Sequence, residues 1–425
     1  MASAASDAPA RLLLESTVRR VVLEAPVIDI HTHLYDPAFE ALLLWGIDDL
    51  LVYHYLVAEA FRYLELPYDA FWRLSKTEQA DLVWKVLFAD RSPLSEAARG
   101  VLTILHRLGI EPRKNDLPAL RRWFADWKVG DYVTRCLDLA RVRQIYMTNS
   151  PFDPLERPVW EASFPRDPRF VAALRIDPLL VAWPSAAEQL RHWGYLEQAT
   201  LDAKAFDGAR RFLADWTRRM AARYVMVSLP PDFRYPHNDA TATLIDQVVL
   251  PFCRESGLPF ALMLGVKRAV NPALQLAGDG VGRSDLTALE NLCSAHPDVR
   301  FLTTVLSREN QHELVVLARK FRNLHVFGCW WFTNIPETIG EMTSMRLELL
   351  GLSFTPQHSD ARVLDQVIYK WEHSRQILAD ALARKYSDLA ASGWWASETE
   401  IRRDVGELLG GAFQRFCGQP TAATP

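Results

Sequence analysis

The sequence is short of cysteine and of basic charge, and each shortage excludes a class of protein. Its five cysteines are odd in number and far apart, and none forms a CxxC pair. This usage favours reduced thiols and a cytoplasmic location, and it argues against zinc held by cysteine. The formal net charge is −4. We therefore expect no binding to nucleic acid or to an anionic membrane surface.

Long apolar runs and glycine-rich nucleotide motifs are also absent. No apolar run approaches the roughly 20 residues that a membrane span needs. The first ten residues lack the apolar stretch of a secretory signal. No GxGxxG or GxxxxGK[ST] motif occurs, so a nucleotide cofactor is not indicated. The 425 residues, 49% hydrophobic and 24% charged, indicate a globular, soluble protein that does not enter membranes.

The most informative stretch is a short apolar run that ends in two histidines. The β-favouring residues Val27 to Ile30 follow Pro26, which suits the first position of a strand. Residues two apart on a strand point to the same face, so His31 and His33 project together from its C-terminal end. Such a pair can bind one metal ion. The alternative, two unrelated polar residues at a strand exit, leaves their pairing unexplained.

Short β-prone runs alternate with helical stretches through the rest of the chain. This alternation is typical of an α/β fold, a (β/α)8 TIM-like barrel, closed by a helix at Val363–Arg384. An eighth strand is needed, and Ser353–His358 is the one place for it. With the strand before His31, the other strands are Val142–Met147, Phe170–Ile176, Tyr224–Leu229, Pro259–Leu264, Val299–Val305 and Leu324–Phe327.

We expect one barrel domain with flanking segments and a helical insertion after strand one. Residues 1–25 form an N-terminal tail and a lead-in helix, and residues 26–385 form the barrel. Residues 386–425 form a C-terminal helical extension and tail. The insertion, at about 34–130, is rich in Leu, Trp and Tyr and has few turn signals, which predicts several helices. It would build a subdomain over one end of the barrel.

Polar residues at the predicted strand ends indicate where a site forms, because barrel enzymes take their catalytic groups from there. Strands one and eight are neighbours in a closed barrel, so Asp360 can converge with His31 and His33 on a divalent ion. Two imidazoles and one carboxylate leave a position open for substrate, and zinc is the first candidate, before manganese or iron(II). Alternatively, Asp360 caps a helix or pairs with Arg362.

Four arginines follow the predicted strands and would gather at the same rim. Their guanidinium groups suit a carboxylate, which they can bind with two parallel hydrogen bonds. The alternative is pairing with rim acids, and for Arg308, beside Glu309, it is equally well supported. The four are Arg175, Arg268, Arg308 and Arg362.

Several segments, in order from about residue 20 to 385, resemble motifs of the uronate (glucuronate) isomerase family of the amidohydrolase superfamily. Together they are more specific than any single one. The segments are His31-Thr32-His33-Leu34, His54-Tyr55, Met147 to Asp153, Leu174-Arg175-Ile176-Asp177, Pro259 to Asn271 with Arg268, Phe327 to Asn334 with Trp331, and Ser359-Asp360-Ala361-Arg362.

The resemblance implies a metal-dependent aldose–ketose isomerase that moves a proton between C2 and C1 of a uronic acid such as glucuronate. It implies His31, His33 and Asp360 as metal ligands. It also implies catalytic roles for Asp360, Tyr55 and Arg362, with Asp360 or Tyr55 relaying the proton. Substrate would be bound by His54, Arg175, Arg268, Trp331 and Asn149.

The chain departs from the family pattern at three places in the expected substrate shell. Met263 stands where the family has a histidine on strand five. Asn149-Ser150 replaces two aspartates, and Lys370-Trp371-Glu372 replaces Arg-His-Glu. We therefore expect the metal site to be kept, with a uronate or a related sugar acid as substrate.

Two other functions stay open at this point. One is a hydrolase, or another reaction on a carboxylated sugar-like substrate; the missing histidines on strands five and six, where Met263 and Thr304 stand, count against it. The other is a non-catalytic binding protein, which the intact set of His31, His33, Asp360 and Arg362 disfavours. The expected partner is a small sugar acid, and a homo-oligomer is compatible with the sequence.

Overall fold

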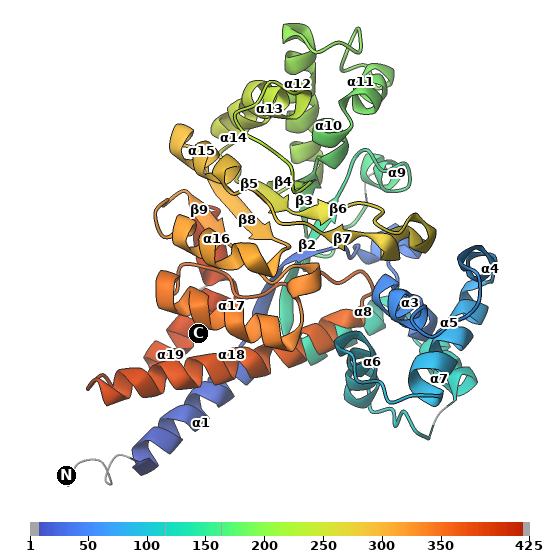
Figure 1. The fold of residues 1–425 in the computed structure, drawn as a ribbon, viewed down its shortest axis with the longest axis vertical. Helices are drawn as coiled ribbons and strands as arrows, with labels where there is room; N and C mark the ends of the chain where they lie inside the picture. The colour runs from blue at the N-terminus through green and yellow to red at the C-terminus, as the bar shows by residue number, and fades with distance from the viewer. Residues whose placement is uncertain (1–7, 115, 163, 420–425) are drawn as a thin grey trace.

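The centre of the molecule is a parallel β-sheet of seven strands, in the order β1-β2-β3-β4-β5-β8-β9 (Figure 1). The computed structural model describes residues 8–114, 116–162 and 164–419. The seven strands predicted from apolar runs are confirmed, with ends shifted by up to two residues. They are β1 (Val27–Thr32), β2 (Val142–Asn149), β3 (Phe170–Arg175), β4 (Val225–Leu229), β5 (Phe260–Leu264), β8 (Phe301–Val305) and β9 (Leu324–Val326).

The predicted eighth strand is not a strand in the described structure, although the segment lies where that strand was expected. The Gly328 amide donates to the Thr355 carbonyl (2.8 Å), beside β9. The His33 amide donates to the Ala361 carbonyl (2.8 Å), beside β1. Asp360 has φ +53°, so the backbone turns out of the extended conformation before a regular ladder forms. Residues 353–361 thus join the two edges of the curled sheet.

Helices follow most strands, and those predicted between the strands are present with shifted ends. Helix α1 (Ala8–Glu24) packs along the long helix α18 (Gln366–Ala391) (Figure 1). The others are α9 (Glu156–Glu161), α10 (Asp177–Val181), α11 (Trp183–His192), α12 (Ala203–Met220), α13 (Ala240–Leu244), α14 (Leu250–Ser256), α15 (Thr287–Ala295), α16 (Gln311–Ala318), α17 (Pro336–Leu350), α19 (Glu398–Gly406) and α20 (Ala412–Phe416).

The segment after β1 consists of short helices, which Figure 1 shows gathered on one side of the sheet. Ser75 and Ser95 begin two of them by accepting hydrogen bonds from the amides of Glu78 and Ala98. The Trp72 indole donates to a carbonyl in the loop after β5 (2.8 Å). The helices are α2 (Ile47–Leu51), α3 (His54–Ala60), α4 (Tyr68–Trp72), α5 (Lys76–Trp84), α6 (Glu96–Arg107), α7 (Leu117–Ala125) and α8 (Val129–Ala140).

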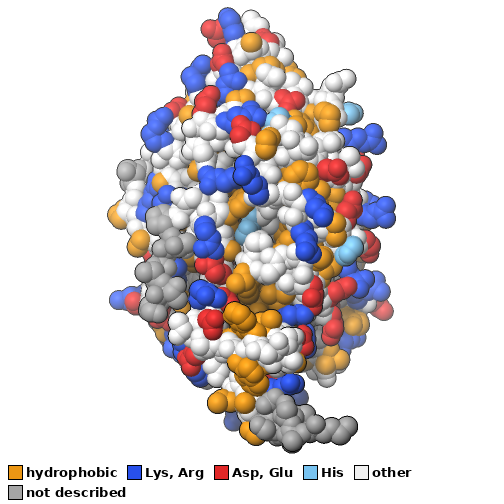
Figure 2. Space-filling view, turned by 90° about the vertical axis from the view of Figure 1, so that its left-hand side faces the viewer, with side chains coloured by type: hydrophobic (Ala, Val, Ile, Leu, Met, Phe, Trp, Pro, Cys, Tyr) orange, Lys and Arg blue, Asp and Glu red, His pale blue; other side chains and the backbone are white. Residues whose placement is uncertain are grey.

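A short antiparallel pair, β6 (Val266–Lys267) and β7 (Gly280–Val281), lies outside the main sheet. It was not predicted, because two residues give no periodic pattern. All five cysteines are free and buried. Within the described residues, no helix is both long and apolar enough to cross a membrane. Charges of both signs are interspersed on the face shown in Figure 2.

A buried carboxylate fastens the joining segment to the first strand. Asp29 of β1 is fully buried and accepts hydrogen bonds from the Ser359 amide (3.0 Å) and the Trp371 indole (2.8 Å). Burial raises the pKa of Asp29 to about 6, although these two donors oppose the rise. One side chain therefore connects β1, the segment before Asp360 and helix α18.

We predict that Gly328→Ala destabilises the protein far more than Gly351→Ala. Both glycines have positive φ, +66° and +61°, where alanine costs about 1 kcal/mol. A Cβ at Gly328 would also lie 1.7 Å from His358 Nδ1, whereas nothing lies within 4 Å at Gly351. The clash should add at least about 2 kcal/mol. Urea denaturation measures both costs, and equal losses would contradict this packing at Gly328.

Candidate active site

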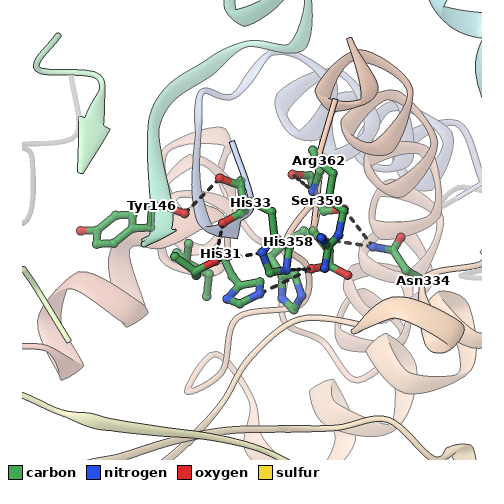
Figure 3. A network of polar contacts seen from close by, with 12 residues as sticks. His31, His33, Tyr146, Asn334, His358, Ser359 and Arg362 are labelled. Atoms are coloured by element: carbon green, nitrogen blue, oxygen red, sulfur yellow. Dashed lines mark hydrogen bonds and ion pairs between the residues drawn. The ribbon is translucent and has the colours of Figure 1, made fainter. Parts of the chain in front are cut away.

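Two histidines and one aspartate converge where β1 meets residues 358–361. Figure 3 shows His31 and His33 beside His358 and Ser359 of that segment. The Nε2 atoms of His31 and His33 each lie 3.4 Å from Asp360 Oδ1. His31 is buried at the end of β1, and His33 follows it, partly exposed. The Asp360 amide donates to the His31 carbonyl (3.2 Å). The predicted convergence of these three side chains is thus present.

The polar atoms of this cluster have the geometry of a metal site. Both ring nitrogens of His31 and Oδ1 of Asp360 are buried and make no hydrogen bond, which is costly for polar atoms without a ligand. Ligand atoms about 2.0–2.2 Å from a tetrahedral ion lie about 3.3–3.6 Å from one another. The 3.4 Å separations match that arrangement. The three residues could hold one divalent ion.

The protonation states of the cluster also suit metal binding. Burial would raise the pKa of Asp360, but the two imidazoles hold it well below its usual value. Burial, reinforced by the Arg362 charge, lowers the pKa of His33 well below its usual range. A charged carboxylate and a neutral imidazole are the forms that bind metal ions.

The cluster lines a small cavity of about 20 Å³, which is room for about one water molecule. Every predicted site residue except Tyr55 and Asn149 lines it, and Met263 lies there in place of the family's histidine. The lining is His31, His33, His54, Arg175, Ser228, Met263, Arg268, Trp330, Trp331, Asp360 and Arg362.

The arginines of the cavity differ in whether an acid already neutralises them. Arg175 pairs with Asp177 (2.7 Å), and Arg268 pairs with Asp279 (2.5 Å). The side chain of Arg362 has no hydrogen bond or ion pair to another described residue. Arg362 is therefore the cavity's available partner for an anionic ligand.

Arg308, the fourth arginine expected at the rim, does not line the cavity. It pairs with Glu341 on α17 (2.8 Å), and both side chains are exposed. The prediction of four rim arginines at the site is therefore wrong for this one. The N-cap alternative for Asp360 is not met either, since α18 begins at Gln366 with Asp365 in the cap position.

His54 and Tyr55 begin helix α3 and contact two neighbouring aromatic rings, those of Trp331 and Phe332. The His54 ring meets the Trp331 ring edge-on, with centroids 5.6 Å apart. Tyr55 lines a second cavity of about 280 Å³, which shares His54 and Trp331 with the first. Trp330 and Trp331 are buried, whereas Phe332 is 40% exposed.

Asn149 turns away from the metal-side cavity and bonds a buried carboxylate that the sequence did not single out. Its Nδ2 donates to Glu156 (3.0 Å), as do the Ser150 amide (2.9 Å) and the Tyr35 hydroxyl (2.9 Å). Glu156 thus places a carboxylate beside the two positions where the family's aspartates are replaced. The substrate-binding role of Asn149 stays a prediction.

His358 is a second residue that the site prediction left out. Its ring lies 5.0 Å from the His31 ring, centroid to centroid, and both of its nitrogens are buried without a hydrogen bond. Its position two residues before Asp360, the same spacing as His31 and His33, was the available signal. It packs against the metal-side cluster without joining it.

Comparisons with known proteins agree with this architecture. No family model and no curated protein sequence matches the chain. A uronate isomerase structure from Bacillus halodurans C-125 matches with 50% identity and a TM-score of 0.95, covering 97% of both chains. Uronate isomerase from Thermotoga maritima (16% identity, TM-score 0.71, 95% of this chain and 97% of that one) and glucuronate isomerase from Caulobacter crescentus (15%, 0.77, 98% and 97%) share the fold.

The fold and the site define an enzyme that binds a small molecule at the carboxyl ends of parallel strands. Half of the residues are shared with a uronate isomerase over nearly the whole length of both chains. The chain belongs to the uronate isomerase family.

We predict that Glu156→Gln removes a loss of stability with rising pH. Burial raises the pKa of Glu156 to about 7, against the opposing hydrogen bonds of Asn149, Ser150 and Tyr35. The folded protein therefore favours the protonated acid. The stability this gives is complete below the unfolded pKa of about 4.5 and is lost as pH rises through about 7.

Urea denaturation at pH 5, 6, 7 and 8 tests this, comparing wild type, Glu156→Gln and the exposed control Glu161→Gln. The difference between Glu156→Gln and wild type should grow in favour of the variant by up to about 3 kcal/mol across this range. The control should follow wild type. A difference that does not change with pH would show that Glu156 is not a strained buried acid.

Proposed function

We propose that this uronate isomerase converts a hexuronate, such as glucuronate, to the corresponding ketose with a divalent ion held by His31, His33 and Asp360. Zinc is the first choice, before manganese or iron(II). The observation that carries the proposal is the cluster itself. The Nε2 atoms of His31 and His33 each lie 3.4 Å from Asp360 Oδ1. The ligand atoms of His31 and Asp360 are buried without a hydrogen bond, and the unpaired Arg362 lines the same cavity.

The reaction moves two protons and shifts the carbonyl from C1 to C2. Removing the proton from C2 of the open-chain aldose leaves its electron pair in a C1=C2 bond and negative charge on the C1 oxygen. The proton on the C2 oxygen passes to the C1 oxygen, and a proton returned to C1 completes the C2 carbonyl and the C1 hydroxyl. No oxidant or reductant is consumed, and one acceptor and one donor of protons are needed.

The side chains of the site supply these roles. The Arg362 guanidinium suits the substrate carboxylate, which it can bind with two parallel hydrogen bonds. The low pKa of Asp360 keeps this side chain ionised and able to accept a proton. Burial raises the pKa of Tyr55 well above its usual value, so its phenol is a donor. A bound divalent ion would polarise the substrate oxygens.

We further propose that the sheet is a (β/α)8 barrel within about 26–385, in which residues 353–361 take the place of the eighth strand. Residues 34–130 are its insertion. The hydrogen bonds of Thr355 toward β9 and of Ala361 toward β1 support this closure. The cytoplasmic location and a homo-oligomeric state stay predictions. No observation favours hydrolysis, because the histidines on strands five and six that a hydrolase would use are missing. Met263 and Thr304 stand at those strands.

We predict isomerisation with hydrogen exchange when the metal-loaded protein meets a hexuronate in D₂O. The group that takes the proton from C2 exchanges it with solvent before returning it to C1, so deuterium should enter the carbon skeleton as the aldose signal falls. Proton NMR on a panel of hexuronates and related sugar acids measures both. Loss of neither the aldose signal nor the C2 proton on any of them would refute the proposed reaction.

We predict that His33→Ala lowers bound metal to well under half of the wild-type content. One of three ligands is lost, and two rarely hold a catalytic ion. Elemental analysis after dialysis measures the content, with His237→Ala as control, because His237 is exposed and pairs with Asp239. A His33→Ala protein that keeps its full metal content would move the site elsewhere.

A further inference from the structure

A buried lysine beside the site has no partner in the described structure. Lys370 of α18 is 5% exposed, and none of the described residues makes a hydrogen bond or an ion pair with its side chain. Its Nζ lies 5.2 Å from the Tyr369 ring centroid and 5.7 Å from that of Tyr55. Both distances are near the outer limit, about 6 Å, of cation–π attraction. A buried ammonium with so little compensation costs stability.

The second cavity, which Tyr55 lines, is where this ammonium is available. Its two acids already have partners. Glu96 bonds His373 (2.6 Å) and Arg99 (2.9 Å), and Glu59 accepts from the Ser95 hydroxyl (2.5 Å). Among the described residues lining this cavity, Lys370 is the charged side chain left without a partner.

This cavity and the metal-side cavity are neighbours. His54 and Trp331 line both. Burial lowers the pKa of Lys370 to about 8, and the charge of Asp360 opposes the fall, so the two groups lie close enough to interact. A ligand held at Arg362 on the metal side and reaching Tyr55 would therefore also approach Lys370.

We propose that Lys370 contacts the reacting end of the sugar acid and neutralises the charge that develops there. The inference rests on the proposed isomerisation. When the C2–H bond breaks and its electron pair forms C1=C2, negative charge moves onto the C1 oxygen. The Lys370 ammonium donates a hydrogen bond to that oxygen. The C2 hydroxyl proton then passes to the C1 oxygen, reprotonation at C1 gives the ketone, and Lys370 neither gains nor loses a proton overall.

The other cations do not replace it. Arg175 and Arg268 are neutralised by Asp177 and Asp279, and Arg362 lines only the metal-side cavity. Preorganised charge of this kind stabilises a transition state more than the bound substrate. The inference also gives a role to one departure from the family pattern, the lysine in Lys370-Trp371-Glu372.

The test compares Lys370→Met and Lys370→Arg with wild type in the metal-loaded full-length protein. Lys385→Met is the matched control, since Lys385 lies on the same helix and pairs with Glu348. Steady-state kinetics on the hexuronate that wild type turns over gives kcat and KM, and NMR in D₂O gives exchange at C2. Thermal unfolding and elemental analysis report on the structure and the metal.

The inference predicts that Lys370→Met lowers kcat about 100-fold or more and slows C2 exchange to match, with KM within about threefold. Thermal stability should rise or stay level, because a buried unpaired charge is removed, and bound metal should not change. Lys370→Arg should recover part of kcat, and Lys385→Met should behave as wild type.

Two results with an active wild type would overturn the inference and leave the proposed function standing. One is a Lys370→Met enzyme with kcat within threefold of wild type. The other is a loss of activity together with lower thermal stability or lost metal, because Lys370 would then act through packing against Tyr55 and Tyr369. A wild type that turns over no hexuronate would refute the proposed function, and this inference with it.

Discussion

Two backbone hydrogen bonds between β1 and the segment after His358 determine where the site forms. They join His31 to Asp360 and His33 to Ala361, residues more than 300 positions apart in the chain. Without them the histidines and the aspartate would lie at opposite edges of an open sheet. The carboxylate of Asp29 stabilises the same junction, because it accepts hydrogen bonds from the Ser359 amide and the Trp371 indole.

Burial then makes the site reactive, at the expense of stability. The ligand atoms of His31 and Asp360 are buried without a hydrogen bond. Burial raises the pKa of Glu156 to about 7. The ammonium of Lys370 has no counter-ion in the described structure. Each is costly in a folded protein without ligands, and each is relieved by binding a cation, a proton or an anionic substrate. His31, Asp360 and Lys370 line this pair of cavities, and Glu156 lies outside it, bonded to Asn149.

The sequence predicted what depends on local pattern. Apolar runs located the seven strands, and the two-residue period of a strand paired His31 with His33. The neighbour relation of first and last strands in a barrel then added Asp360. Most residues named from the family motifs line the metal-side cavity, and a structure with 50% identity shows why the motifs could be recognised.

What the sequence left out depends on how distant segments pack. Asp360 has a positive φ just after the expected eighth strand, which no propensity indicated. In the described structure that strand is reduced to an isolated bridge at Thr355. The sequence did not single out Glu156, which the fold buries against Asn149. Lys370 was noted as a departure from the family motif, but its burial without a counter-ion was not predicted. Burial and missing partners are properties of the folded chain, so only the structure identifies these groups.

The most direct test of the central claim is anomalous diffraction from crystals of the protein grown with zinc, recorded on both sides of the zinc absorption edge. The account predicts one strong peak about 2.0–2.2 Å from the Nε2 atoms of His31 and His33 and from Oδ1 of Asp360. A peak held by other residues, or none at this junction with zinc in excess, would contradict it.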